Sequence, residues 1–378
     1  MRLFLLVRED FILTQKEEII DFDSLYESMW KCRRGVSWKP GVKHYTLNGI
    51  AETVKLCREL ESGTYQNGKP KPIQILYPKK REGLSIPFRD RVYQRSINDN
   101  VLYPEMTRHF ILDNCACQQG KGPDFARERL RKHLWNFYCN YGLDGYVIQA
   151  DIHGYYPNMR HEEVRKCFER YLDPEVFRMV MKVLDSQYAG DTGYNPGSQM
   201  VQIAGISLLD KLDHYIKERM HVKHYIKYMD DFWALENSYK RAEEILTVIT
   251  DHLAEMGFEV NEKKTHIRPI SKGFEFLGFN YRLTETGKIV MTITGQNVHH
   301  ERKKTVHMIR SGATKEKCDE CIHAWEAHAD HGNTYHVKGR TKAYYKKKWK
   351  EAENAKVQRK TDGTSGGAGV CKPSGWAD

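Results

Sequence analysis

The sequence predicts an α+β fold in which helices back an antiparallel sheet, and three observations lead to it. Two arms of β-prone residues flank the adjacent acids Asp230 and Asp231, so we expect a hairpin with carboxylates at its tip. An apolar run at residues 145–150 ends at Asp151, which predicts a strand that brings a third carboxylate beside the hairpin. Several segments before, between and after these strands carry apolar residues at helical spacing.

The acidic hairpin carries the strongest signal in the sequence. Residues 223–229 and 232–235 form its arms, with Tyr228 and Met229 directly before the acids. Two acids at a tight turn repel each other and lose hydration, a cost usually tolerated where a divalent cation offsets the charge. The alternative is an ordinary polar turn, because Asp is common in turns. The Tyr-Met-Asp-Asp context and the acid upstream favour a catalytic site.

This motif, together with Asp151 and the aromatic Tyr156 five residues later, resembles the palm signatures of bacterial retroelement-type reverse transcriptases. That group includes retron, diversity-generating retroelement and abortive-infection or defence-associated enzymes. The resemblance implies a right-hand polymerase with fingers, an antiparallel-sheet palm and a helical thumb. The segments expected from it are a helical N-terminal segment at 1–72, fingers at 73–145, a palm at 146–290, a thumb at 291–360 and a flexible tail at 361–378.

The composition agrees with a nucleic-acid partner. The chain has 378 residues with 60 Lys and Arg against 50 Asp and Glu, a net charge of +10, which favours a polyanion. Its nine cysteines show no framework spacing, so we expect reduced thiols and a cytoplasmic location. The apolar opening at residues 3–7 is too short for a signal-peptide core or a membrane span, and no membrane partner is expected.

The fingers are expected to begin with a strand at residues 73–77 that returns through a turn bearing Lys79, Lys80 and Arg81. Arg supplies a bidentate fork and Lys a point charge, and a triphosphate needs positive charge held at fixed distance. The resemblance implies that these three residues bind the nucleotide phosphates. The alternative is a solvated turn, since many charge runs are only surface.

A helix is predicted from residue 88 to about residue 103, where the resemblance places Arg89 and Arg91 along the template phosphates. A glycine-bearing loop follows at 114–123, in which backbone approach to the template is expected. Cys115 and Cys117 in this loop have no nearby His partner, so a zinc site is rejected there. Two helical runs are predicted within 21–60, the first with Leu25, Met29 and Cys32 on one face and the second with the apolar positions Leu47, Ile50, Val54, Leu56 and Leu60. Further helices are predicted at 124–141, 160–171, 175–186 and 239–256.

In the palm, the resemblance implies that Asp151, Asp230 and Asp231 bind two Mg²⁺ ions, with a backbone carbonyl from Ile152. It also implies that Tyr156 crowds the 2′ position of an incoming nucleotide, which favours deoxynucleotides. Such ions would lower the pKa of a primer 3′-hydroxyl and neutralise the triphosphate.

A glycine turn at Gly197 precedes a long helix predicted from residue 203 to about residue 220. The resemblance implies nucleotide contacts from Gly197 and Gln202. The chain departs from the family here: Gln202 stands where many reverse transcriptases carry proline. Relatives of the diversity-generating type share this Gln, but Val201 replaces their usual Ser.

Further along the chain, Lys264 is expected to approach the pyrophosphate leaving group as a general acid, the alternative being a lysine-rich turn. A hairpin with Phe276, Leu277 and Gly278 is expected to grip the primer end, because Gly permits close backbone approach. These assignments follow from the resemblance.

The basic helical region from residue 299 to about residue 360 is expected to lie along a primer–template duplex, with contacts from Arg302, Lys303 and Lys304. A rival assignment is a structural zinc site, because Cys318, Cys321 and His328 could share one helix face. No second ligand pair lies at zinc-finger spacing, so packing within the thumb is favoured.

The predicted function is RNA-directed DNA synthesis by two-metal nucleotidyl transfer, with template RNA, dNTPs and a DNA product as partners. The template is expected to be a cognate non-coding RNA, in a phage-defence role. One rival is an untemplated, protein-primed or RNA-making polymerase, although Tyr156 argues against RNA synthesis. Another is a non-catalytic RNA-binding protein, which the intact acids disfavour. Self-association is left open.

Overall fold

The structure is a computed structural model that describes residues 14–75, 81–195 and 197–362. The chain divides into two compact units, Met1–Pro269 and Ile270–Asp378. This division falls within the segment predicted as palm, and the assignment of fingers, palm and thumb stays a prediction. Every described helix lacks the length or the apolar character needed to cross a bilayer. All the described cysteines are free thiols.

The described part of the first unit, which starts at residue 14, opens with four helices. Thr14 and Glu17 form a reciprocal capping box at the start of the first helix, and Asp21 caps the second. The face predicted for the second helix is confirmed, because Leu25, Met29 and Cys32 are buried. The helices are α1 (Gln15–Ile20), α2 (Phe22–Arg33), α3 (Pro40–Leu47) and α4 (Gly49–Glu61).

The predicted apolar face of the second run is wrong at its start. Leu47 is 84% exposed and Ile50 is 64% exposed, whereas Leu56 and Cys57 are buried. The helix begins only at Gly49, after a break at Asn48, so Leu47 belongs to α3 and has a different orientation.

The predicted fingers hairpin is present as β1 (Lys71–Ile75) and β2 (Arg81–Ser85), paired antiparallel with Ile75 opposite Arg81. The helix predicted after it is α5 (Phe88–Ile97). It continues as a π-helical turn at Asn98–Leu102 and then as α6 (Tyr103–Thr107).

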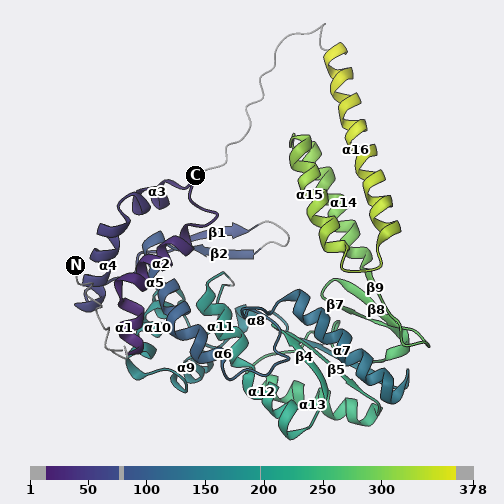
Figure 1. Ribbon diagram of the computed structural model, residues 1–378, viewed down its shortest axis with the longest axis horizontal. Coiled ribbons are helices and arrows are strands. Elements are labelled where there is room, and N and C mark those ends of the chain that lie inside the picture. The colour runs from purple at the N-terminus through teal and green to yellow at the C-terminus, as the bar shows by residue number, and fades with distance from the viewer. Residues whose placement is uncertain (1–13, 76–80, 196, 363–378) are drawn as a thin grey trace, which may run out of the picture. The chain divides into compact units, whose positions relative to one another are not determined.

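The centre of the first unit is a four-stranded antiparallel sheet in the order β4-β5-β3-β6. Strands β4 and β5 of this sheet are labelled in Figure 1. Helix α13 packs on β3 and β5, and α7 packs against β4. Successive residues of β3 and β5 are buried, so both faces of these strands are covered, which accounts for their continuous apolar runs. The strands are β3 (Tyr146–Asp151), β4 (His224–Tyr228), β5 (Asp231–Glu236) and β6 (His266–Pro269).

The helices predicted around the sheet are present, with one correction. The single helix predicted at 203–220 begins earlier, at Gln199, and is interrupted at Leu209, whose backbone is not helical. The helices are α7 (Pro123–Tyr141), α8 (Tyr155–Asn158), α9 (His161–Glu169), α10 (Pro174–Gln187), α11 (Gln199–Leu208), α12 (Asp210–His214), a π-helical turn (Tyr215–Arg219) and α13 (Tyr239–Glu255).

Up to residue 362, where the described part ends, the second unit combines a three-stranded antiparallel sheet, β7-β8-β9, with three α-helices. Cys318 and Ile322 of the second helix lie in an apolar cluster with Ile309 and Tyr345. Cys318 is therefore a core residue, as the packing alternative to zinc predicted. The elements are a 3₁₀ turn (Ile270–Lys272), β7 (Phe274–Phe276), β8 (Phe279–Leu283), β9 (Ile289–Ile293), α14 (Gly295–Arg310), α15 (Lys315–Ala329) and α16 (Tyr335–Asp362).

Candidate active site

The sheet brings the predicted acids to one end. Strand β3 pairs with β5 so that Asp151 lies directly opposite Asp231, and Tyr228 of β4 lies opposite Asp231 on its other side. The two residues between β4 and β5, Met229 and Asp230, form the turn. Met229 has φ of 57°, a left-handed conformation that is unfavourable for a residue with a side chain.

Asp151 is held by a segment that follows α13. The Lys264 ammonium lies 2.7 Å from Asp151 Oδ1, and Asn261 Nδ2 donates to Oδ2 at 3.0 Å. The backbone N–H of Asn261 also donates to the Asp151 carbonyl at 2.7 Å. Lys264 was predicted near the site, although its observed partner is a carboxylate of the chain. Sequence reasoning made no prediction for Asn261. Its place three residues before Lys264 was the one feature that could have indicated a role at the site.

The electrostatics of the acids show that their charges are not balanced by the protein alone. Burial, the hydrogen bond with Asp151 and the charges of Asp230 and Asp151 raise the pKa of Asp231 to about 8. Burial lowers the pKa of Lys264, but its hydrogen bond and attraction to Asp151 outweigh this and the pKa is raised. Lys264 therefore offsets only part of the negative charge that Asp151, Asp230 and Asp231 place together.

Within the described residues, no three His, Cys, Asp or Glu side chains are arranged to hold a metal ion together. The donor chemistry nevertheless fits Mg²⁺, because carboxylate oxygens are the ligands that this hard cation prefers. The raised pKa of Asp231 also marks negative charge that a cation would relieve. Binding would require Asp231 to lose its proton and Asp151 to release Lys264. Ile152 is buried beside these acids, in a bridge with Val260.

Tyr156 lies just beyond the end of β3, in the short helix α8. Its ring packs on Gly205 of α11, where an added Cβ would come within 3.4 Å of the ring and its hydroxyl. Tyr155 anchors the same helix, because its hydroxyl donates to the Gly205 carbonyl at 2.5 Å. Gln202 is half-buried one turn earlier on α11.

A polar cavity of about 480 Å³ lies between the β1–β2 hairpin, α2, α5 and the start of α11. Arg91 and Gly197 line it, which brings together two residues predicted to bind nucleic acid or nucleotide. Gln94 also lines it, is only 7% exposed, and has an amide nitrogen without a hydrogen-bond partner in the described structure. The cationic residues that line it are Lys31, Arg34, Lys39, Arg91 and Arg95.

Arg89, on the same helix, has a different environment. Its guanidinium forms an ion pair with Glu59 at 2.5 Å and lies 5.4 Å from the Tyr65 ring centre. These contacts tie α5 to α4, so they weaken the predicted role of Arg89 at the template. Lys79 and Lys80 lie outside the described residues, and Arg81 is described only as the first residue of β2.

Residues 90–281 match the sequence model of one family, described as reverse transcriptase (RNA-dependent DNA polymerase). The match spans just over half of the chain. The chain belongs to this family. The predicted α+β right-hand polymerase fold is confirmed, and RNA-directed DNA polymerase is the enzyme class of the family. The bacterial subgroup stays a prediction.

One matching solved structure is telomerase from Candida albicans, in complex with a fragment of telomeric RNA. It has 10% sequence identity to this reverse transcriptase and a TM-score of 0.45. The match covers 81% of this chain and 65% of the telomerase chain. No match was found among curated protein sequences.

In the second unit of this reverse transcriptase, Leu277 and Gly278 form a two-residue turn between β7 and β8. Both have positive φ, 47° and 81°, as the tight hairpin turn with right-handed strand twist requires. Phe276 is buried before the turn. The predicted primer-gripping hairpin therefore exists as a structure, while its contact with primer stays a prediction.

The predicted basic residues of α14 differ in their surroundings. The Arg302 guanidinium lies 5.1 Å from the ring centre of Tyr344 on α16, a packing contact. Lys304 is 3.8 Å from Glu301. Lys303 is exposed, and of these three it is the side chain most open to a ligand.

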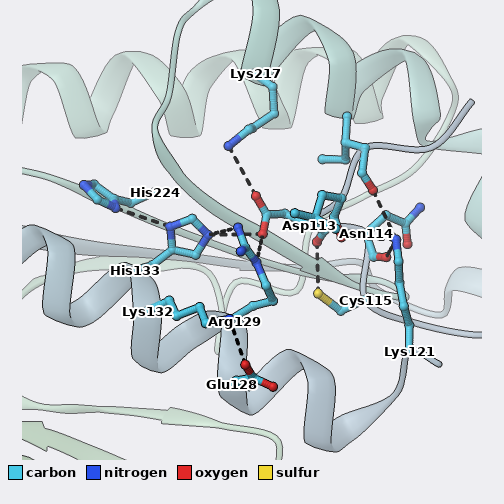
Figure 2. A network of polar contacts seen from close by, with 12 residues as sticks. Asp113, Asn114, Cys115, Lys121, Glu128, Arg129, Lys132, His133, Lys217 and His224 are labelled. Carbon is cyan, nitrogen blue, oxygen red and sulfur yellow. Dashed lines mark hydrogen bonds and ion pairs between the residues drawn. The ribbon is translucent and has the colours of Figure 1, made fainter.

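Sequence reasoning missed a polar network at the β4 edge of the four-stranded sheet (Figure 2). Asp113 is 3% exposed and accepts from Arg129 at 2.7 Å, His133 at 3.1 Å and Lys217 at 3.4 Å. His133 in turn contacts His224 of β4, with 3.3 Å between their Nδ1 atoms. No local pattern could reveal this network, because it joins residues up to about a hundred positions apart.

Proposed function

We propose that the chain is an RNA-directed DNA polymerase that adds deoxynucleotides to a primer. The observation that carries this proposal is the meeting of Asp151 with the Asp230–Asp231 turn at one end of the sheet. Membership of the reverse transcriptase family supports the same reaction.

In this proposal, Asp151, Asp230 and Asp231 hold two Mg²⁺ ions, with the Ile152 carbonyl as a further ligand. When bound, Mg²⁺ would lower the pKa of the primer 3′-hydroxyl and neutralise the triphosphate. Asn261 orients Asp151 through two hydrogen bonds, which limits the freedom of that carboxylate. Lys264, released from Asp151, would donate a proton to the leaving pyrophosphate.

The nucleotide and template are assigned to neighbouring surfaces of the first unit. Tyr156, held by its packing on Gly205, would exclude a ribose 2′-hydroxyl. Gln202, Gly197 and the fingers residues Lys79, Lys80 and Arg81 would contact the nucleotide. The cavity lined by Arg91 and Gln94 suits single-stranded template, because it joins cations for phosphates with a buried amide that needs a partner.

The test is extension of oligo(dT) on poly(rA) with dTTP and Mg²⁺. Asp230→Asn should reduce incorporation about a thousandfold or more, because a metal ligand is lost from the reacting centre. Binding of the primer–template should change less than about threefold. Asp251→Asn, an exposed position on α13, is the matched control and should retain wild-type incorporation. An Asp230→Asn variant with near-normal synthesis would sink the assignment.

Two control reactions separate the rival functions. DNA synthesis that persists when poly(rA) is omitted would point to an untemplated or protein-primed polymerase. RNA binding without synthesis by the wild-type protein would point to a non-catalytic RNA-binding protein. The clustered carboxylates disfavour the second outcome, since acids without a cation destabilise the fold.

We further propose that the template is a cognate non-coding RNA and that the protein acts in phage defence in the bacterial cytoplasm. This proposal is supported by the resemblance to bacterial retroelement-type enzymes. The experiment is purification from cells that carry the native flanking DNA, followed by sequencing of co-purified RNA and DNA. One RNA species with complementary DNA is the expected result; DNA without a complementary RNA would contradict it.

A further inference from the structure

The strand that leads into the catalytic turn contains a fully buried charge. Lys227 of β4 is 0% exposed, and its ammonium lies 2.5 Å from Oδ2 of Asp213 on α12, which is also 0% exposed. The hydroxyl of Tyr225, two residues earlier on β4, donates to Oδ1 of the same carboxylate at 2.6 Å. One carboxylate thus holds two side chains of one strand.

Stability alone does not explain this arrangement. The free energy of desolvating two charges commonly exceeds the free energy gained from their attraction. A protein with apolar residues of similar size in their place is often at least as stable. Burial raises the pKa of Asp213, while the charge of Lys227 acts in the opposite direction. What the pair supplies beyond stability is specificity of position, because a displaced strand would leave two buried charges unpaired.

The geometry specifies the register of β4. Tyr225 and Lys227 are two residues apart and therefore lie on the same face of the strand. A slip of one residue would turn both side chains to the opposite face. The backbone of Lys227 is fixed as well: its N–H donates to the Asp113 carbonyl at 3.0 Å, and its carbonyl accepts from Cys115 at 2.9 Å.

The pairing of Lys227 with β5 sets the position of the turn that contains Asp230. Lys227 lies opposite Phe232 and Tyr228 lies opposite Asp231, so only Met229 and Asp230 remain for the turn. Met229 is in a left-handed conformation, which persists only where the surroundings impose it. A strand held at Lys227 supplies that constraint directly before the turn.

We propose that Asp213 and its two partners, Lys227 and Tyr225, are positioning residues that fix the register of the β4–β5 hairpin and so the location of Asp230. The effect on rate rests on the proposed polymerase function. The effect on the hairpin does not, and it is measured separately.

The experiment replaces Asp213, Lys227 and Tyr225 together, so that no buried charge is left without a partner. The variant Tyr225→Phe/Lys227→Met/Asp213→Leu should keep a thermal midpoint close to that of the wild type. Hydrogen exchange of the amides of residues 228–232 should become about tenfold faster. On poly(rA)–oligo(dT), kcat should fall about a hundredfold with little change in the KM for dTTP, because misplacement acts on the reacting centre.

The control is Lys132→Met/Glu128→Leu, which removes an exposed ion pair on α7 and should change neither exchange nor rate. A folded triple variant with wild-type exchange at residues 228–232 would overturn the proposal. If the triple variant does not fold, Tyr225→Phe decides: exchange about threefold faster supports the proposal, and unchanged exchange overturns it. A wild-type protein inactive on poly(rA) would refute the polymerase function, while the exchange data would still decide the register.

Discussion

Two aspartates of the first unit, the buried Asp113 and the half-buried Asp231, have pKa values shifted in opposite directions. Asp231, at the end of the four-stranded sheet where the acids meet, faces Asp151 and Asp230, and its pKa is raised to about 8. Asp113, at the β4 edge, would also have a raised pKa from burial alone. Hydrogen bonds from His133 and Arg129 and the charges of His133 and Lys217 outweigh this and hold the pKa of Asp113 below its ordinary value.

The direction of each shift shows that the Asp113 carboxylate stabilises the fold and that the Asp231 carboxylate destabilises it. Asp113 is surrounded by protein cations, so its ionised form is favoured in the folded state. Asp231 lies beside Asp151 and Asp230, and their charges disfavour its ionised form when no divalent cation is bound. Without a divalent cation, we therefore expect removal of the Asp113 charge to lower the free energy of unfolding and removal of the Asp231 charge to raise it.

The largest effect on stability is expected for Asp113→Asn. The change leaves Arg129, His133 and Lys217 without their shared anion, and the free energy of unfolding should fall by about 3 kcal/mol. Urea denaturation at pH 7 with chelator present measures it. Asp251→Asn serves as control and should lie within about 0.5 kcal/mol of wild type. A loss below about 1 kcal/mol for Asp113→Asn would contradict the stabilising role of the network.

Asp231→Asn should act in the other direction. Like charges directly opposite on paired strands are destabilising, so the free energy of unfolding without divalent cations should rise by about 1–2 kcal/mol. DNA synthesis should fall in the same variant. The same urea titration, run with chelator, checks the sign. A destabilised Asp231→Asn protein would remove the contrast between the two aspartates.

A smaller, pH-dependent effect is expected for His224. Burial, and then the charges of His133, Lys217 and Lys223, lower its pKa from 6.5 to about 4, while Asp113 acts in the opposite direction. Above pH 6.5 His224 is neutral in both states. As the pH falls towards 4, the unfolded state takes up a proton that the folded state does not, so stability is lost.

We therefore expect the wild type to lose about 1 kcal/mol more stability than His224→Gln between pH 7 and pH 5, after allowance for partial solvent exposure. Urea titrations at the two pH values measure this difference. Equal losses in both proteins would show that His224 titrates normally in the folded state.

The smallest effect is expected for the exposed pair of Figure 2, Lys132 and Glu128 on α7, whose charged atoms are 2.8 Å apart. Lys132→Ala should change the free energy of unfolding by less than about 0.5 kcal/mol, because solvent screens exposed pairs. High salt should abolish even this difference. A change above 1 kcal/mol would show that the pair contributes to the buried network.

Most of the elements, and the meeting of the three acids, could be predicted from the sequence alone. Adjacent acids between two β-prone arms predict the hairpin, and a third acid at the end of an apolar run predicts the strand beside it, since both signals are local. Helical periodicity likewise placed α7, α10 and α13 within one or two residues of their observed bounds. The break at Leu209 was missed, because the apolar pattern continues through it.

The partners of the charged side chains could not be predicted from the sequence and became visible only in the folded chain. Arg89 and Arg91 are neighbours on one helix, yet one pairs with Glu59 while the other lines the cavity. Lys227 carries no sequence signal of burial, and its partner Asp213 comes from a different element. The physical reason is that partners distant in sequence, brought together by packing, decide whether a charge is solvated, paired or left for a ligand.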